Sequence, residues 1–154
     1  MRLGHVDLKV ADLERAVRFY CDVLGFTVAE RSDEASIAFL RAEGDGAFHL
    51  ALTAGESLGG APPPPGSTGL DYVALLYPDR GALAAACRGL IEAGAPIERF
   101  DDHGVGESLY ARDPDGNGLE LYWERPRAAW PREDGELAMF TRPLELGDLV
   151  ASSL

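Results

Sequence analysis

Three residues of types that could bind a metal or take part in catalysis lie in stretches of strand-like alternation. They are His5, His49 and Glu120. Successive side chains of a strand point to opposite faces, and the neighbours of these residues are mostly apolar. The apolar neighbours would pack under helices. His5, His49 and Glu120 would then project, together with Tyr72, from the opposite, concave face of a curved sheet.

Two imidazoles and one carboxylate that meet at one point form a metal-binding arrangement suited to Fe(II), with Mn(II) as a second candidate. The arrangement fills one side of an octahedron and leaves positions open for a substrate and dioxygen. Zn(II) is a third candidate, less favoured with an oxygen donor nearby. Glu120 gives the best single support, because a carboxylate between two leucines is costly to bury unpaired.

Other interpretations of these residues stay open. His5 could be a strand histidine that faces solvent, and His49, in a fairly apolar strand, could be a hydrogen-bonded core residue. Tyr72 could be a cavity wall, a hydrogen-bond donor behind the ligands or a fourth ligand. A metal site is favoured only because these residues are expected to project from the same face of the sheet.

The elements that would position these residues repeat along the chain. A strand at 3–10 precedes a helix at 11–26, which Asp12 can cap and Gly25 can end. Three strands follow at 27–33, 35–43 and 47–53, with polar turns around Asp33 and at 43–46. The segment 54–68 is predicted to be a linker, since its four consecutive prolines cannot pair within a sheet.

The same order then begins again at 69–124. A strand at 70–79 is followed by an Ala-rich helix at 80–94, which Asp79 can cap and Gly94 can end. Strands at 96–103, 106–118 and 119–124 complete a second βαβββ module, matching the first at 1–53. The chain is therefore predicted to be α+β, with two βαβββ modules forming a curved mixed sheet or open barrel around a cavity, helices outside. Residues 125–154 would be a C-terminal tail that packs on the domain or on a partner.

Composition narrows the function classes. The chain of 154 residues has 26 acidic and 14 basic residues and a formal charge of -12, so it would repel nucleic acid and anionic membranes. No stretch is apolar enough for a membrane span, and Met1 and Arg2 run directly into a strand without a secretory signal, so we expect a cytoplasmic protein. Cys21 and Cys87 form no CxxC pair and indicate small buried thiols.

Beyond these patterns the chain resembles a known superfamily. The stretches "GHVDLKVADLERAVRFYCDVLGF" and "DHGVGESLYARDPDGNGLELYWERP", with the two modules, resemble the vicinal oxygen chelate superfamily of glyoxalases, bleomycin-resistance proteins and extradiol dioxygenases. "GLDYVALLYPDRGALAAACRGLIEAG" and "RPRAAWPR" are more narrowly similar to short-module catechol 2,3-dioxygenases. The resemblance covers almost the whole chain. The superfamily also includes isomerases, lyases, thiol transferases and metal-free drug-binding proteins.

The resemblance implies roles for individual residues. His5 and Glu120 match ligand positions on the first and last strands of a module, and His49 matches a further superfamily ligand position. Extradiol dioxygenases usually have histidine where this chain has Tyr72. Tyr110, ten residues before Glu120, resembles the family tyrosine that hydrogen-bonds a substrate oxygen. His103 is the best candidate for an acid or base near the substrate, because imidazoles ordinarily titrate near neutrality.

The resemblance therefore implies a metal-dependent enzyme, most like an extradiol dioxygenase that opens a catechol-like aromatic with dioxygen. Dioxygenases of this kind commonly join two such domains, so a homodimer is expected to supply the second one. A metal-free protein that binds a drug or metabolite and a glyoxalase-like isomerase or lyase are the alternatives. The enzymes require bound metal, and only the dioxygenase consumes oxygen.

Overall fold

The computed structural model describes residues 1, 3–42 and 48–151. The chain divides into two compact units. The first comprises Met1–Gly69 together with Asp113–Asn117, and the second comprises Leu70–Arg112 and the chain from Gly118 onward.

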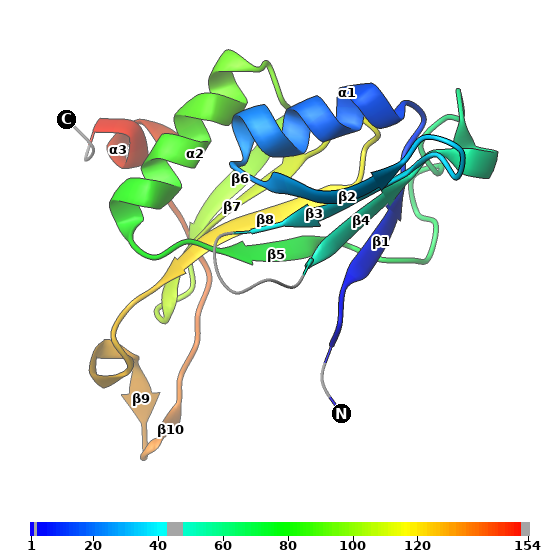
Figure 1. Cartoon of the computed structure of the whole chain (residues 1–154). Helices are drawn as coiled ribbons and strands as arrows, with labels where there is room; N and C mark the ends of the chain where they lie inside the picture. Colours follow the sequence, from blue (N-terminus) through cyan, green and yellow to red (C-terminus); the bar gives the residue numbers. More distant parts are fainter. Residues whose placement is uncertain (2, 43–47, 152–154) are drawn as a thin grey trace. The chain divides into compact units, whose positions relative to one another are not determined.

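The first unit is a four-stranded mixed sheet covered by one helical segment (Figure 1). Strands β1 and β4 are parallel, and the sheet order is β1-β4-β3-β2. The elements in chain order are β1 (Val6–Lys9), α1 (Leu13–Arg18), η1 (Phe19–Val23), β2 (Thr27–Ser32), β3 (Ile37–Arg41), β4 (Leu50–Thr53) and the short η2 (Gly55–Ser57).

The predicted helix at 11–26 is an α-helix only in its first part. Asp12 caps α1, accepting a hydrogen bond from the Arg15 N–H at 3.0 Å, and the chain then widens into the π-helical turn η1. Gly25 ends the segment at φ 81°, a left-handed conformation that glycine adopts without strain. The apolar side of α1 is buried and contacts β3 and β4.

The second unit is a five-stranded mixed sheet with the order β11-β6-β7-β8-β5 (Figure 1). Asp79 caps its main helix, accepting a hydrogen bond from the Ala82 N–H at 2.8 Å, and this helix contacts β8. The elements up to the last long strand are β5 (Val73–Leu76), α2 (Arg80–Glu92), β6 (Ile97–Asp102), β7 (Gly106–Arg112) and β8 (Gly118–Glu124).

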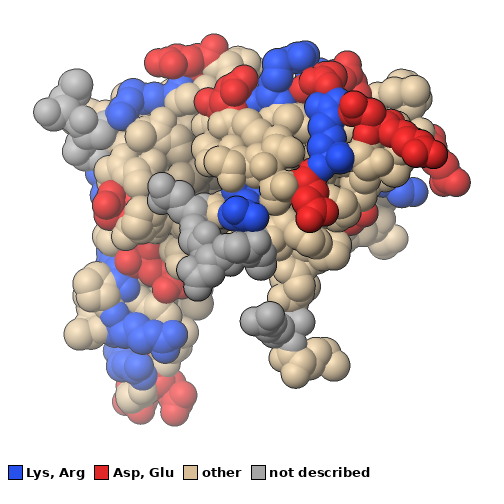
Figure 2. All heavy atoms as spheres, in the orientation of Figure 1, with Lys and Arg blue, Asp and Glu red and all other residues tan. Residues whose placement is uncertain are grey.

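The segment predicted as a tail forms secondary structure on the second unit. Strand β11 (Arg142–Pro143) pairs antiparallel with β6, and helix α3 (Leu146–Ala151) contacts α2 and buries Leu149 completely. Between them and β8 lie η3 (Arg127–Ala129) and a hairpin of β9 (Arg132–Glu133) and β10 (Glu136–Leu137), which extends from the unit at the lower left of Figure 1. Figure 2 shows both signs of charge on this hairpin, with acidic side chains at its tip.

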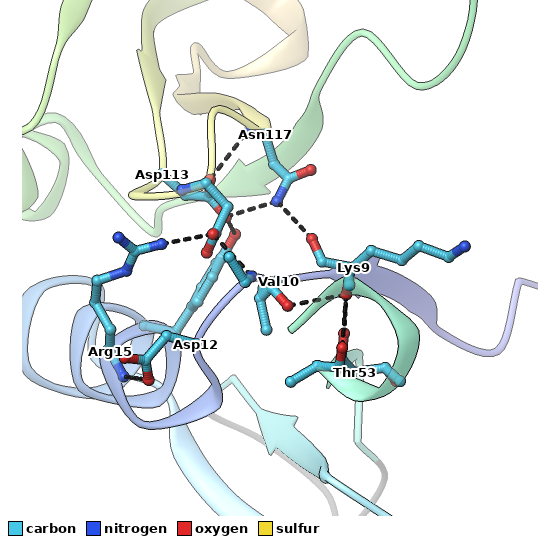
Figure 3. A network of polar contacts seen from close by, with 12 residues as sticks. Lys9, Val10, Asp12, Arg15, Thr53, Asp113 and Asn117 are labelled. Carbon is cyan, nitrogen blue, oxygen red and sulfur yellow. Dashed lines mark hydrogen bonds and ion pairs between the residues drawn. The ribbon is translucent and has the colours of Figure 1, made fainter. Parts of the chain in front are cut away.

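The strand predicted at 106–118 ends earlier than expected, and the sequence DPDGNG, a strong turn signal, forms a turn. Strand β7 ends at Arg112, and residues 113–117 form a turn that belongs to the first unit (Figure 3). The buried Asp113 accepts the Tyr20 hydroxyl at 3.0 Å, and the Asp115 carboxylate accepts the Ala11 N–H at 2.9 Å and an Arg15 N–H at 2.6 Å. The two carboxylates replace the water that the Tyr20 hydroxyl and the Ala11 and Arg15 N–H groups would otherwise bind. The turn therefore satisfies polar groups at both ends of the first helical segment.

The α+β class and the two βαβββ modules are confirmed, with the strands in two open mixed sheets. The predicted turn at 43–46 lies outside the described residues. In the part of the chain that the structure describes, no helix has the length and apolarity needed to span a bilayer.

Candidate functional site

His5 and His49 occupy matching places in the first unit. Each immediately precedes a strand rather than lying within it, because β1 begins at Val6 and β4 at Leu50. Val6 pairs with Leu50 in the parallel ladder, and the Val6 N–H donates to the His49 carbonyl at 3.1 Å. The backbone therefore places the two histidines side by side at the start of neighbouring strands.

Both histidine side chains are exposed, so His49 is not the core residue of the alternative interpretation. The His5 ring lies against aromatic neighbours, with its centroid 4.9 Å from that of Phe48 and 6.4 Å from that of Phe39. These contacts limit the directions that the His5 ring can take without occupying its nitrogens. Both imidazoles are therefore open to solvent.

In the second unit, three of the predicted residues form a continuous hydrogen-bonded row. Tyr110 on β7 lies opposite Glu120 on β8, and its hydroxyl donates to Glu120 Oε1 at 3.1 Å. His103, in the turn between β6 and β7, places Nε2 3.0 Å from the same hydroxyl. The row runs from an imidazole through a phenol to a carboxylate, three groups that can each hold or pass a proton.

Tyr72 and Arg99 enclose the middle of this row. The Tyr72 ring packs edge-on to that of Tyr110, with centroids 5.6 Å apart. Arg99 on β6 places its guanidinium carbon 3.6 Å from the centre of the Tyr110 ring, as in a cation–π contact. Sequence reasoning missed Arg99, because its register opposite Tyr110 follows a β-bulge between Ile97 and Arg99 that alternation does not reveal.

The environment of Tyr110 favours its neutral form. Burial raises the pKa of Tyr110 first, and the nearby Glu120 charge and the hydrogen bond to it raise the pKa further. A phenol with a raised pKa stays protonated at neutral pH and acts as a hydrogen-bond donor. Tyr110 has one proton and two neighbouring acceptors, so it can pair with only one of them at a time as donor.

Each unit contains a cavity. One of about 30 Å³ in the second unit is lined by Tyr72, Arg99 and Tyr110 among others, and is about large enough for a water. A larger one of about 460 Å³ in the first unit lies beside the start of α1 and the 58–62 segment, lined by Asp12, Arg15 and Asp115 among others. None of the predicted site residues lines this larger cavity.

The predicted ligand set takes His5 and His49 from the first unit and Glu120 from the second. Across residues 1, 3–42 and 48–151, no three His, Cys, Asp or Glu side chains are grouped closely enough to hold a metal ion. The ligand set stays a prediction. Its donor chemistry fits Fe(II), because two imidazoles and one carboxylate are nitrogen and oxygen donors of the kind that this ion takes.

The sequence is similar to those of known proteins. The model of the Glyoxalase/Bleomycin resistance protein/Dioxygenase superfamily matches residues 2–121. A catechol-2,3-dioxygenase of Bacillus subtilis (strain 168) is 39% identical over 150 residues, covering 96% of this chain and 50% of that protein. A biphenyl-2,3-diol 1,2-dioxygenase of Rhodococcus globerulus is 35% identical over 121 residues, covering 78% of this chain and 62% of that protein. The chain thus spans between half and two thirds of the length of these relatives.

Solved structures agree on the fold. The crystal structure of a glyoxalase/dioxygenase from Nostoc punctiforme has a TM-score of 0.66 and 22% identity, covering 81% of this chain and 92% of that one. At this level of identity the likeness concerns the arrangement of helices and strands and carries no information on the reaction.

Proposed function

The chain belongs to the Glyoxalase/Bleomycin resistance protein/Dioxygenase superfamily, and from this premise we propose that it is a metal-dependent extradiol dioxygenase that cleaves the ring of a catechol-like aromatic. The observation that carries the proposal is the row His103–Tyr110–Glu120, in which an imidazole, a phenol and a carboxylate are hydrogen-bonded within the second unit. The dioxygenase names of two relatives at 39% and 35% identity support it.

The metal would be held by His5, His49 and Glu120, with Fe(II) the expected ion and Mn(II) or Zn(II) the alternatives. The pairing of β1 with β4 supports His5 and His49 as joint ligands, because the two histidines directly precede Val6 and Leu50, which are paired in the parallel ladder. When bound, Fe(II) would supply Lewis-acid and redox chemistry and leave positions open for a chelating diol and dioxygen.

The chain's own residues would then handle the substrate protons. A diol that binds must lose a hydroxyl proton, and His103 Nε2 would receive it by way of the Tyr110 hydroxyl, which lies 3.0 Å away. Tyr110 would afterwards steady the substrate oxygen as a donor. The Tyr72 ring would form a wall of the site, in edge contact with Tyr110.

We also propose a homodimer in the cytoplasm. Three large apolar side chains of the C-terminal segment are exposed, Leu137, Met139 and Phe140. Clustered exposed apolar side chains of this kind mark protein–protein contacts more often than isolated ones do. A partner of the same chain would cover them.

Metal content tests the proposed ligands. Protein purified without added metal should contain about one metal ion per chain by elemental analysis, because a three-donor site takes one ion. Glu120→Gln and His5→Ala should each lose most of that metal while circular dichroism stays as in the wild type. Glu124→Gln, an exposed carboxylate on the same strand, is the matched control and should keep its metal. Full occupancy in either ligand variant would sink the ligand set.

Oxygen consumption tests the reaction. The Fe(II)-loaded protein mixed with catechol or 2,3-dihydroxybiphenyl should consume one dioxygen per diol and form a yellow ring-fission product. Turnover of an α-hydroxythioether without oxygen uptake would instead indicate a glyoxalase-like isomerase. Tight ligand binding with neither metal nor turnover would indicate a drug-binding protein.

A further inference from the structure

Asn117 carries the only side-chain amide of the chain, because the 154 residues include no second asparagine and no glutamine. It ends the turn at 113–117, and the next residue, Gly118, begins β8. In an asparagine–glycine pair the glycine nitrogen reaches the side-chain carbonyl carbon with the least steric hindrance, because glycine has no Cβ. The single amide of this chain therefore stands in the sequence context that deamidates most readily.

The packing of the second unit requires glycine at position 118. A Cβ there would lie 1.8 Å from the Asp71 carbonyl oxygen and 2.9 Å from the Asp71 carbonyl carbon, and both are backbone atoms. Gly118 is buried and pairs with Arg112 in the ladder between β7 and β8. A side chain that would slow attack on Asn117 therefore has no room at this position.

The Asn117 amide is held by acceptors of the first unit. Its Nδ2 donates to Asp113 Oδ2 at 2.9 Å and to the Lys9 carbonyl at 3.4 Å, as Figure 3 shows. The backbone N–H of Asn117 donates to the other Asp113 oxygen at 2.8 Å. Asp113 is only 3% exposed, so these donors replace water at its carboxylate. The amide nitrogen must leave both acceptors before it can depart as ammonia, which requires the turn to open.

We propose that Asn117 is a site of spontaneous deamidation, which occurs when the turn 113–117 opens and which then weakens the attachment of that turn. The Gly118 nitrogen gives up its proton and bonds to Asn117 Cγ, while the bond from Cγ to Nδ2 breaks and ammonia leaves. Water opens the resulting cyclic imide at either carbonyl and gives aspartate or isoaspartate, without oxidation or reduction. This inference does not depend on the proposed function.

Both products remove a donor from a buried carboxylate. Aspartate and isoaspartate each present a second negative charge where Asp113 now receives an N–H, and two carboxylates at this separation repel each other. Isoaspartate also adds one carbon to the backbone directly before β8. Asp113 also accepts the Tyr20 hydroxyl at 3.0 Å, so the damage reaches the contact that joins the turn to η1. The modified turn therefore cannot restore its former contacts.

The intact mass of the full chain tests the modification. Replacement of the amide by a carboxyl group raises the mass, and only Asn117 can contribute such a gain. Isomerisation at the aspartate–glycine pair 115–116 leaves the mass unchanged. At mildly alkaline pH the folded chain should gain mass at least about tenfold more slowly than the same chain unfolded in urea, because the reaction waits for local opening. A folded chain that gains mass as fast as the unfolded one, or does not gain it at all, would overturn the proposal.

Substitution on α1 tests the dependence on opening. Arg15→Ala removes the N–H that Asp115 Oδ1 accepts at 2.6 Å, so it should speed the mass gain several-fold. Arg18→Ala, at an exposed position of the same helix, is the matched control and should deamidate as the wild type does. Urea below the unfolding transition should also speed the wild type, which covers the case in which Arg15→Ala does not fold. A rate that neither Arg15→Ala nor urea changes would refute control by opening.

Asn117→Asp tests the consequence by supplying one of the two products directly. This variant should unfold at a lower urea concentration than the wild type, because its carboxylate faces that of Asp113. Thr68→Asp adds the same charge at an exposed position of the first unit and should unfold close to the wild type. Equal midpoints for Asn117→Asp and the wild type would refute the weakened attachment. Equal losses in the two variants would assign the effect to net charge and refute it as well.

Discussion

At the scale of single residues, the contact that most constrains the chemistry is the one between Tyr110 and its two acceptors. The Tyr110 hydroxyl oxygen lies 3.1 Å from Glu120 Oε1, to which it donates, and 3.0 Å from His103 Nε2. Protonation of either neighbour changes which of them the phenol faces. Tyr110 therefore couples the state of His103 to that of Glu120 through one hydroxyl group.

Removing that hydroxyl tests its role. Tyr110→Phe should lower kcat for ring cleavage by about 10²-fold, in the range that a positioned proton donor or acceptor contributes. KM should change little, because the ring still packs against Tyr72 and Arg99. Steady-state oxygen uptake measures both constants. Tyr122→Phe, a tyrosine on β8 with no role in the row, is the control, and a kcat of Tyr110→Phe equal to that of the control would remove Tyr110 from the mechanism.

The same residues show what sequence could and could not predict. Alternation with family resemblance pointed to His103, Tyr110, Glu120 and Tyr72, which contact one another within one unit, and their roles stay predictions. Arg99 was missed because a β-bulge shifts its register, and a bulge is not visible in residue types.

At the scale of elements, caps and stops were predictable because they depend on neighbouring residues. Asp12, Asp79 and Gly25 act as expected, since a capping carboxylate needs only the next turn of helix and a positive φ needs only glycine. The turn at 113–117 was different. Its residues mark a turn on their own, but Ala11 and Arg15, the partners of Asp115, lie about one hundred positions away, which no local pattern contains.

The Tyr20–Asp113 contact leads to a prediction about alkaline pH. Burial raises the pKa of Tyr20 well above its ordinary value of 10.0, and the charge of Asp113 raises the pKa further. The unfolded chain loses this proton near pH 10 and the folded one does not, so the free energy of unfolding should fall as pH rises through and above 10. Tyr77, whose pKa burial raises to about 12, adds to the same loss.

Urea unfolding of the wild type and of Tyr20→Phe at pH 7 and at pH 11 measures this effect. At pH 7 the variant should be less stable by about 1 kcal/mol, the net value of one hydrogen bond, with a further cost for the unpaired Asp113 oxygen. Between the two pH values the variant should lose less stability than the wild type, because it lacks one titrating group. Equal losses in both proteins would show that Tyr20 does not resist ionisation in the fold.

At the scale of the whole molecule, the proposed homodimer gives the last prediction. Light scattering should give a mass of twice the 16.5 kDa of one chain. Leu137→Glu should shift the protein towards the monomer, because a buried carboxylate in an apolar contact is costly. Leu58→Glu changes a leucine that is exposed in the linker of the first unit and should leave the dimer intact. A wild-type protein of monomeric mass would exclude the dimer.

The turn at 113–117 has a consequence for how such a chain can be cut or recombined. A gene segment ending after Gly69 would encode the first βαβββ module without Asp113 and Asp115, leaving the Tyr20 hydroxyl and the Ala11 amide to find other acceptors. The two βαβββ modules of the chain resemble duplicates, but one cannot replace the other. Exchange of one module with that of a relative would combine hydrogen-bond donors and acceptors that did not evolve together. A chimaera that takes residues 113–117 from the same parent as residues 1–69 should therefore be more stable than one divided at residue 69 alone.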